Sequence, residues 1–139
     1  MTMIVENAVY PKGEQLTKTL GAGSNGPIVM LNLLRFKEKA QYKDGGGESI
    51  DGRTAYNRYG DEMRAFIESH GARILFVGEV RSLVIGHVGD LWDAVALVEY
   101  PSSEAFVKIA MSPDVAKFGV HREAGLAGQL LIQTVQSEA

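Results

Sequence analysis

The stretch that decides the fold is Trp92-Asp-Ala-Val-Ala-Leu-Val-Glu-Tyr100, which is followed by Pro101 and Ser102. Valine and aromatic residues favour a β-strand, and Pro101 ends it because proline has no N–H to donate to a sheet. Ser102 can cap a helix by accepting a hydrogen bond from its first free N–H groups. The stretch therefore predicts a strand over 92–100 and a helix over 103–111.

A second helix and a last strand complete this unit. Ser112-Pro113 places a capping serine before a proline at the first helical position, which predicts that a helix restarts there. Its predicted exit into a strand over 129–135 is bracketed by Gly125 and Gly128. The apolar stripe of this helix is predicted to consist of Val115, Phe118 and Leu126.

Residues 27–80 repeat this order with longer connections. The almost uninterrupted apolar run Ile28–Phe36 predicts a strand that is covered on both faces. Residues 37–52 are polar and include three consecutive glycines, 45–47, so they are predicted to form a mobile lid or rim. Apolar positions from Tyr56 to His70 have helical spacing, and Gly71 supplies a stop. A strand over 72–80 follows, with an extension to 83–85 left open.

Two β-α-β units joined end to end predict an α+β fold of the ferredoxin-like β-α-β-β-α-β type, an antiparallel sheet with both crossover helices on one face. Residues 1–26 are expected to form an N-terminal arm with a short helical piece over 13–20, and residues 27–139 a single domain. Because the first strand is apolar on both faces, the sheet face without helices is expected to pack against a second subunit in a homodimer.

Composition and motifs exclude several classes. The chain of 139 residues is 45% hydrophobic with a net charge of −3, which argues against nucleic acid or an anionic membrane as the main partner. Residues 1–7 lack the basic region and the long apolar stretch of a signal peptide, and no segment has membrane-spanning length, so a cytoplasmic location is expected. The chain has no cysteine, which excludes disulfide and thiolate chemistry, and no histidine motif that binds metal. Gly21–Gly26 matches a dinucleotide-binding fingerprint in letters, but the predicted helix precedes it and the strand follows, which is the wrong order. No metal or other cofactor is predicted.

Three segments, 26–37, 92–102 and 121–126, resemble the family catalogued as domain of unknown function 1330. The resemblance covers about residues 27–135. Members are similar to the dimeric α/β-barrel superfamily, in which two ferredoxin-like subunits pair their sheets. This resemblance implies a dimer and a ligand space between the sheet and the helices, and it does not imply one reaction, because the family has no settled activity.

Candidate site residues are the polar groups expected to face that space. Asn32 interrupts the apolar first strand, so its amide must bond either to a ligand or to neighbouring backbone. Tyr56 and Tyr59, one helical turn apart, and Tyr100 on the third predicted strand could line a cavity, with plain core packing as the alternative.

His121 and Arg122 share one predicted helical turn. An imidazole can exchange a proton near neutral pH, and a guanidinium can hold a carboxylate or enolate, so His121 is the candidate catalytic residue and Arg122 a candidate anchor for the substrate. The alternative is a pair of cations at a helix C-terminus, partnered by Glu123 or Glu99.

Two functions follow from these residues. The first is a small enzyme that acts on an acidic, enolic or phenolic metabolite by cofactor-independent proton transfer or monooxygenase chemistry. The alternative is a homodimer that binds such a molecule without catalysis or serves as a scaffold.

Overall fold

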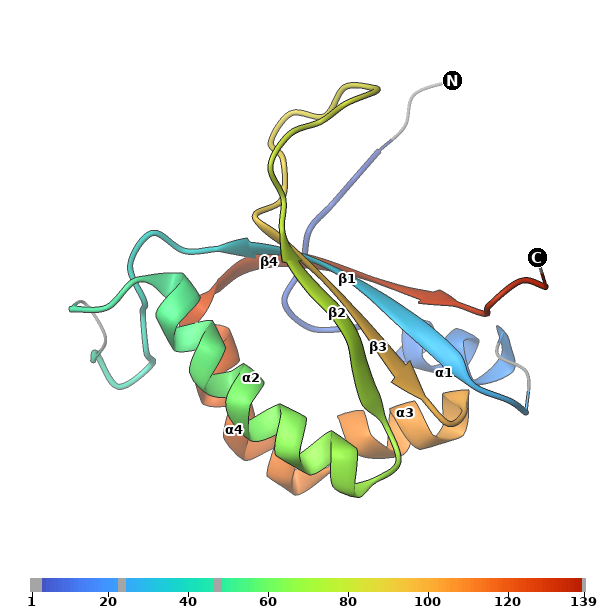
Figure 1. The fold of residues 1–139 in the computed structure, drawn as a ribbon. Coiled ribbons are helices and arrows are strands. Elements are labelled where there is room, and N and C mark those ends of the chain that lie inside the picture. The colour runs from blue at the N-terminus through green and yellow to red at the C-terminus, as the bar shows by residue number, and fades with distance from the viewer. Residues whose placement is uncertain (1–3, 23–24, 47–48, 139) are drawn as a thin grey trace.

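The structure, a computed structural model, describes residues 4–22, 25–46 and 49–138. The described part contains four helices and four strands, whose bounds are α1 Gly13–Ala22, β1 Ile28–Phe36, α2 Gly52–Ser69, β2 Arg73–Glu79, β3 Ala94–Tyr100, α3 Ser103–Ala110, α4 Pro113–Gly125 and β4 Leu126–Thr134 (Figure 1). After α1, this is the predicted β-α-β-β-α-β order, with the second helical connection divided into α3 and α4.

The four strands form one antiparallel sheet in the order β2-β3-β1-β4. Helices α2, α3 and α4 lie against one face of it, as Figure 1 shows, and the predicted ferredoxin-like fold is confirmed. On the covered face, Ile28, Met30 and Leu34 of β1 are buried and pack with residues of the helices and of β3. The side chains of opposite parity form the open face of the sheet, which no helix of the described chain covers, and they include Leu31, Leu33, Val95 and Leu97.

Three predicted helix signals have the expected geometry. The Ser102 side chain accepts a hydrogen bond from the Ala105 N–H at 3.0 Å, and Ser112 accepts one from Asp114. Gly71 has a positive φ of 84°, a conformation that suits glycine, and it directly follows the cap of α2.

The starts of β3 and β4 differ from the prediction. Trp92 and Asp93 precede β3 rather than open it, because the Asp93 carboxylate accepts from the Phe36 N–H at 2.8 Å at the end of the ladder. Leu126 does not belong to the stripe of α4: it is the first residue of β4, three residues before the predicted start, and it is buried beside Leu34.

Gly125 is the last residue of α4, at the predicted helix exit, and it also has a packing role. A Cβ at this position would lie 2.2 Å from the carbonyl oxygen of Gly52 and 2.8 Å from the Tyr56 nitrogen. A Cβ on Gly52 would in turn lie 2.2 Å from the oxygen of Lys37. The two glycines therefore allow the end of α4 to contact the start of α2 directly.

The prediction that residues 37–52 form a lid or rim of the ligand space is wrong for the described part of that segment. Ala40 is buried with Ala55 and Ala124, and the Gln41 N–H donates to the Ala124 oxygen at 2.9 Å. The segment therefore packs on α2 and α4, and none of its residues lines the cavity described below. Gly47, in the predicted glycine run, lies outside the described residues, as do Gly23 and Ser24 of the Gly21–Gly26 motif.

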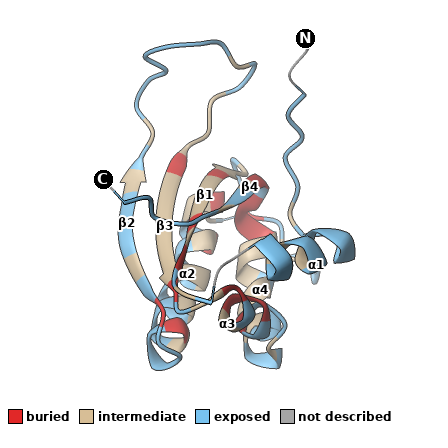
Figure 2. Cartoon of the chain, turned by 90° about the vertical axis from the view of Figure 1, so that its right-hand side faces the viewer, coloured by how far each residue is buried: buried red, intermediate tan, exposed pale blue. Residues whose placement is uncertain are grey.

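Two segments extend from the sheet, as Figures 1 and 2 show. The connection between β2 and β3 contains no strand at 83–85, and Val84 and Ile85 are both 88% exposed. The N-terminal arm runs back to β4, where Ala8 forms an antiparallel bridge with Gln129 through hydrogen bonds of 3.1 and 2.8 Å. The helical piece expected after the arm is α1.

Candidate functional site

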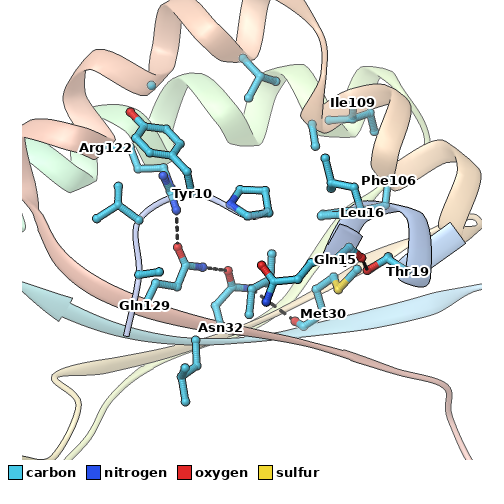
Figure 3. Close-up of a pocket in the computed structure, with 18 of the residues that line it drawn as sticks. Tyr10, Gln15, Leu16, Thr19, Met30, Asn32, Phe106, Ile109, Arg122 and Gln129 are labelled. Atoms are coloured by element: carbon cyan, nitrogen blue, oxygen red, sulfur yellow. Dashed lines mark hydrogen bonds between the residues drawn. The ribbon is translucent and has the colours of Figure 1, made fainter. Parts of the chain in front are cut away.

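A cavity of about 580 Å³ lies between the covered face of the sheet and the helices (Figure 3). This volume is in the usual range for small-molecule sites. Strands β1 and β4 supply one wall and helices α2, α3 and α4 supply another. The N-terminal arm and α1 close one side, where Tyr10, Gln15 and Leu16 face the space.

Asn32 lies in the cavity wall on β1. Its Nδ2 donates to the backbone oxygens of Ala96 at 3.3 Å and Met30 at 3.4 Å, and its Oδ1 accepts from Gln129 Nε2 at 2.8 Å. Both readings of the sequence therefore hold in part: the amide faces the expected space, and it is satisfied within the protein.

Gln129 was not identified from the sequence, although it joins the other polar groups. Its side chain is buried, and its Oε1 accepts from the guanidinium of Arg122 at 2.6 Å. Hydrogen bonds thus run from Arg122 to Gln129, from Gln129 to Asn32, and from Asn32 to backbone oxygens (Figure 3). A backbone oxygen can only accept, so the orientation of each amide in this chain is fixed. The sequence signal that could have identified Gln129 is a polar residue at the predicted start of an otherwise apolar last strand.

Arg122 presents the guanidinium from α4 to the cavity. Among the described residues no carboxylate lies within 4.0 Å of it, and its other neighbour is the ring of Tyr10, at 5.6 Å from the guanidinium carbon. The alternative partners are engaged elsewhere, since Glu99 bonds to Arg73 at 2.9 Å and Glu123 pairs with Lys43 at 3.2 Å. A guanidinium with a neutral amide as its acceptor keeps donors for an anion.

His121 does not share this site. Its Nδ1 lies 2.7 Å from the hydroxyl of Tyr42, its Nε2 lies 3.9 Å from a carboxylate oxygen of Glu62, and it does not line the cavity. Successive residues of an α-helix project about 100° apart, so neighbours in sequence face different surroundings. The expectation that His121 and Arg122 face one ligand is wrong.

The structure places Tyr56, Tyr59 and Tyr100 at the cavity. The rings of Tyr56 and Tyr59 are 5.4 Å apart, and no described residue hydrogen-bonds to any of the three hydroxyls within 3.5 Å. Burial raises the pKa of all three phenols, while the positive charge of Arg122 opposes this for Tyr56 and Tyr59. The hydroxyls therefore stay protonated at neutral pH and can donate to a ligand.

Tyr10 fixes the arm beside this group. Its hydroxyl donates to Glu123, and this bond is the main cause of the raised pKa of Tyr10 and the lowered pKa of Glu123. Asn7 accepts from the indole N–H of Trp92 at 2.7 Å. No local pattern indicates these contacts, because they join segments that are far apart in the chain.

In the part of the chain that the structure describes, no three acidic or histidine side chains are grouped so that they could hold a metal ion. None of the described helices combines the length and apolarity needed to cross a bilayer.

The family described as "Domain of unknown function (DUF1330)" matches residues 47–135. This chain belongs to that family. The DUF1330 chain is also similar in structure to RPA0582 of Rhodopseudomonas palustris, described as a protein of unknown function, with 29% identity and a TM-score of 0.85 over 96% of this chain and all (100%) of that one. The methylated RPA0582 protein gives 30% identity and a TM-score of 0.86, over 95% and 96% of the two chains.

A more distant structure, from Bacteroides fragilis, is described as a dimeric protein of unknown function with a ferredoxin-like fold. It is 14% identical, with a TM-score of 0.51 over 78% of this chain and 94% of that one, so it supports the fold alone. No curated protein matches the DUF1330 chain.

Proposed function

We propose that this protein is a homodimeric binding module that takes a small acidic, enolic or phenolic molecule into the cavity and does not transform it. The observation that carries the proposal is Arg122, whose guanidinium has a neutral acceptor and no carboxylate partner among the described residues. Arg122 is half-buried, and removing a cation even partly from water costs free energy that an anion would offset. A ligand anion would supply that missing charge.

The tyrosines support the same class of ligand. Hydroxyls of Tyr56, Tyr59 and Tyr100 are donors that bond to no acceptor among the described residues, and their raised pKa values keep the protons on them. Donors of this kind suit the oxygens of a carboxylate, an enolate or a phenolate. Apolar lining from Met30, Met63, Phe106 and Val115 suits a hydrocarbon body.

Binding without catalysis is favoured over the enzymatic alternative by the surroundings of His121. A general base needs a pKa near the working pH and must reach the substrate proton. His121 bonds to Tyr42 outside the cavity. Among the described residues, no histidine, lysine or aspartate lines the cavity.

The dimer part of the proposal rests on the open face of the sheet. Leu31, Leu33 and Leu97 lie on it in neighbouring strands, and Phe76 and Ile132 extend it. Soluble monomers rarely expose a contiguous apolar patch of this kind, so a second copy packed face to face is the proposed cover. The description of the Bacteroides fragilis neighbour as dimeric agrees with this.

The test replaces Arg122 by glutamine and measures binding of decanoic acid and of decanol by calorimetry. Loss of a charged hydrogen bond costs about 1.5–3 kcal/mol, so we expect the variant to bind the acid about 10- to 100-fold more weakly. Binding of the alcohol should hardly change. The matched control is Arg58→Gln, which removes an exposed arginine of α2 that does not line the cavity. Equal acid binding by wild type and Arg122→Gln would contradict the proposal.

A further inference from the structure

We propose that the ligand is an elongated hydroxy acid, with its carboxylate at Arg122 and a terminal hydroxyl at Gln133. This inference rests on the proposed function and adds the class and length of the ligand. It comes from a second polar group that also lines the cavity and is not part of the Arg122 hydrogen-bond chain.

Gln133 offers an acceptor at its end of the cavity. Its Nε2 donates to Ser103 Oγ at 2.9 Å and to the backbone oxygen of Thr19 at 3.2 Å, which uses both amide hydrogens. The Thr19 oxygen can only accept, so the amide cannot be reversed, and Oε1 remains the free atom. No described residue donates to this Oε1. In the half-buried and buried residues that the structure describes, every side-chain nitrogen or oxygen that is closed off from solvent has a hydrogen-bond partner, so an Oε1 without a partner must be accessible. Oε1 is therefore open to a donor from outside the protein.

The two polar groups lie at opposite ends of the cavity. Gln129 and Gln133 are on the same face of β4, opposite Leu34 and Met30 of β1 in the strand register. Four residues of an extended strand span ~13 Å, which sets the distance between them along the floor. In Figure 3, Arg122 and Gln129 lie on one side of the cavity, and Thr19, whose backbone oxygen accepts from Gln133, lies on the other.

Apolar side chains line most of the space between the ends, and the one polar group on the floor there, the Asn32 amide opposite Leu131, is already bonded within the described protein. Leu131 lies between the two glutamines on the same face of β4, lines the cavity and is 46% exposed. Met30 lies opposite Gln133 on β1, and Phe106 and Ile109 of α3 complete the lining toward the Gln133 end. A saturated or aromatic body covering Leu131 would remove this apolar surface from water, at about 25 cal/mol per Å².

The chemistry of the two ends differs, and this sets the ligand class. Arg122 supplies donors with a positive charge, so it requires an anionic acceptor. The Oε1 of Gln133 is an acceptor, so it requires a donor such as a hydroxyl. A second carboxylate at that end would face an oxygen with no proton to share, and a methyl group would leave Oε1 unpaired. The site therefore distinguishes hydroxy acids from dicarboxylic acids and from plain fatty acids.

The experiment compares ω-hydroxydecanoic acid, decanoic acid and sebacic acid by calorimetry on the wild-type protein. One added hydrogen bond predicts that the hydroxy acid binds about three- to tenfold more tightly than decanoic acid, with sebacic acid the weakest of the three. The shorter pair, ω-hydroxyhexanoic and hexanoic acid, cannot reach both ends and should bind equally. The Gln133→Met variant should remove the preference for the terminal hydroxyl, whereas Gln136→Met, which replaces an exposed glutamine after β4, should preserve it.

The outcomes separate this inference from the proposed function. Two results would overturn the hydroxy-acid inference alone while acid binding still depends on Arg122. The first is that the terminal hydroxyl does not tighten binding, and the second is that it tightens binding equally in Gln133→Met. Absence of any Arg122-dependent acid binding overturns both. If Gln133→Met does not fold, the series of chain lengths on the wild-type protein decides the question.

Discussion

Replacing Gly125 by alanine should destabilise the protein by crowding the contact between α4 and α2. The new Cβ would lie 2.2 Å from the Gly52 oxygen and 2.8 Å from the Tyr56 nitrogen. Both are backbone atoms, so no side-chain rotation can relieve the contact. The two helices would have to move apart, which would also disturb the packing of Ala55 and Ala124 beside them.

The expected loss follows from two opposing effects. Overpacking of a well-packed contact costs about 1–3 kcal/mol and occasionally more, and the clash with two backbone atoms places this change at the upper end. Alanine regains at most about 1 kcal/mol through its better helix propensity. We therefore expect the free energy of unfolding to fall by about 2 kcal/mol. With a urea m-value of about 2 kcal/mol/M, the midpoint of unfolding should fall by about 1 M.

The assay is equilibrium unfolding in urea at one fixed protein concentration, because dimerisation would make stability depend on concentration. Gly60→Ala is the matched control, since Gly60 is inside α2 and a Cβ there would meet no atom within 4 Å. That change should raise stability by about 0.5–1 kcal/mol. If Gly125→Ala were as stable as Gly60→Ala, the close contact between the helices would be refuted.

Three further predictions concern other parts of the molecule. Leu33→Glu, which puts a charge at the centre of the open face, should convert the dimer to a monomer in light scattering; an unchanged mass would contradict the proposed interface. His121→Ala should leave acid binding measured by calorimetry unchanged, because the imidazole bonds to Tyr42 outside the cavity. Weaker binding would instead support a site in which His121 and Arg122 contact the same ligand. The lowered pKa of Glu123 stabilises the folded protein above about pH 4.5, and this stability is lost as the pH falls through the folded pKa. Tyr10→Phe removes the hydrogen bond that lowers the pKa, so the free energy of unfolding in urea should fall less between about pH 5 and pH 3 in the variant than in the wild type. An equal fall in both proteins would refute this.

The fold was largely predictable because its signals are local. Ser102 and Ser112 cap helices through atoms two or three residues away, and Gly71 follows the end of α2 through its own backbone angle. The apolar run Ile28–Phe36 likewise identifies the strand that is covered on its helix face. Each of these features depends on residues that are close in the sequence, so the local sequence predicts them.

Within the site, a residue was predictable only where it interrupts the apolar pattern of its own strand or helix. Asn32 was found because it interrupts an apolar strand. The error at His121 came from treating a helical turn shared with Arg122 as a shared direction, although successive residues of a helix project about 100° apart. Val115 and Arg122 are seven residues apart and therefore share one face of the helix, and both line the cavity.

The remaining features depend on contacts between distant segments. Residues 37–46 and 49–51 looked like a free loop because of their glycines and charges, yet Ala40 is buried against Ala124 of α4. The arm closes the cavity through the bridge between Ala8 and Gln129, which joins opposite ends of the chain. No local propensity specifies either contact, because each depends on the surface that the finished fold presents.

Gln129 connects these long-range features to the proposed ligand. Its backbone holds Ala8 of the arm, and that bridge could be made by almost any residue. The buried side chain, in contrast, depends on the residue type. An amide costs free energy in the interior unless it is fully paired, and a leucine could fill the same space without that cost. The amide is paired with Arg122 at one end and Asn32 at the other. A buried glutamine here thus gives the cationic group a neutral acceptor, which orients the guanidinium while leaving its charge for an anion from solution.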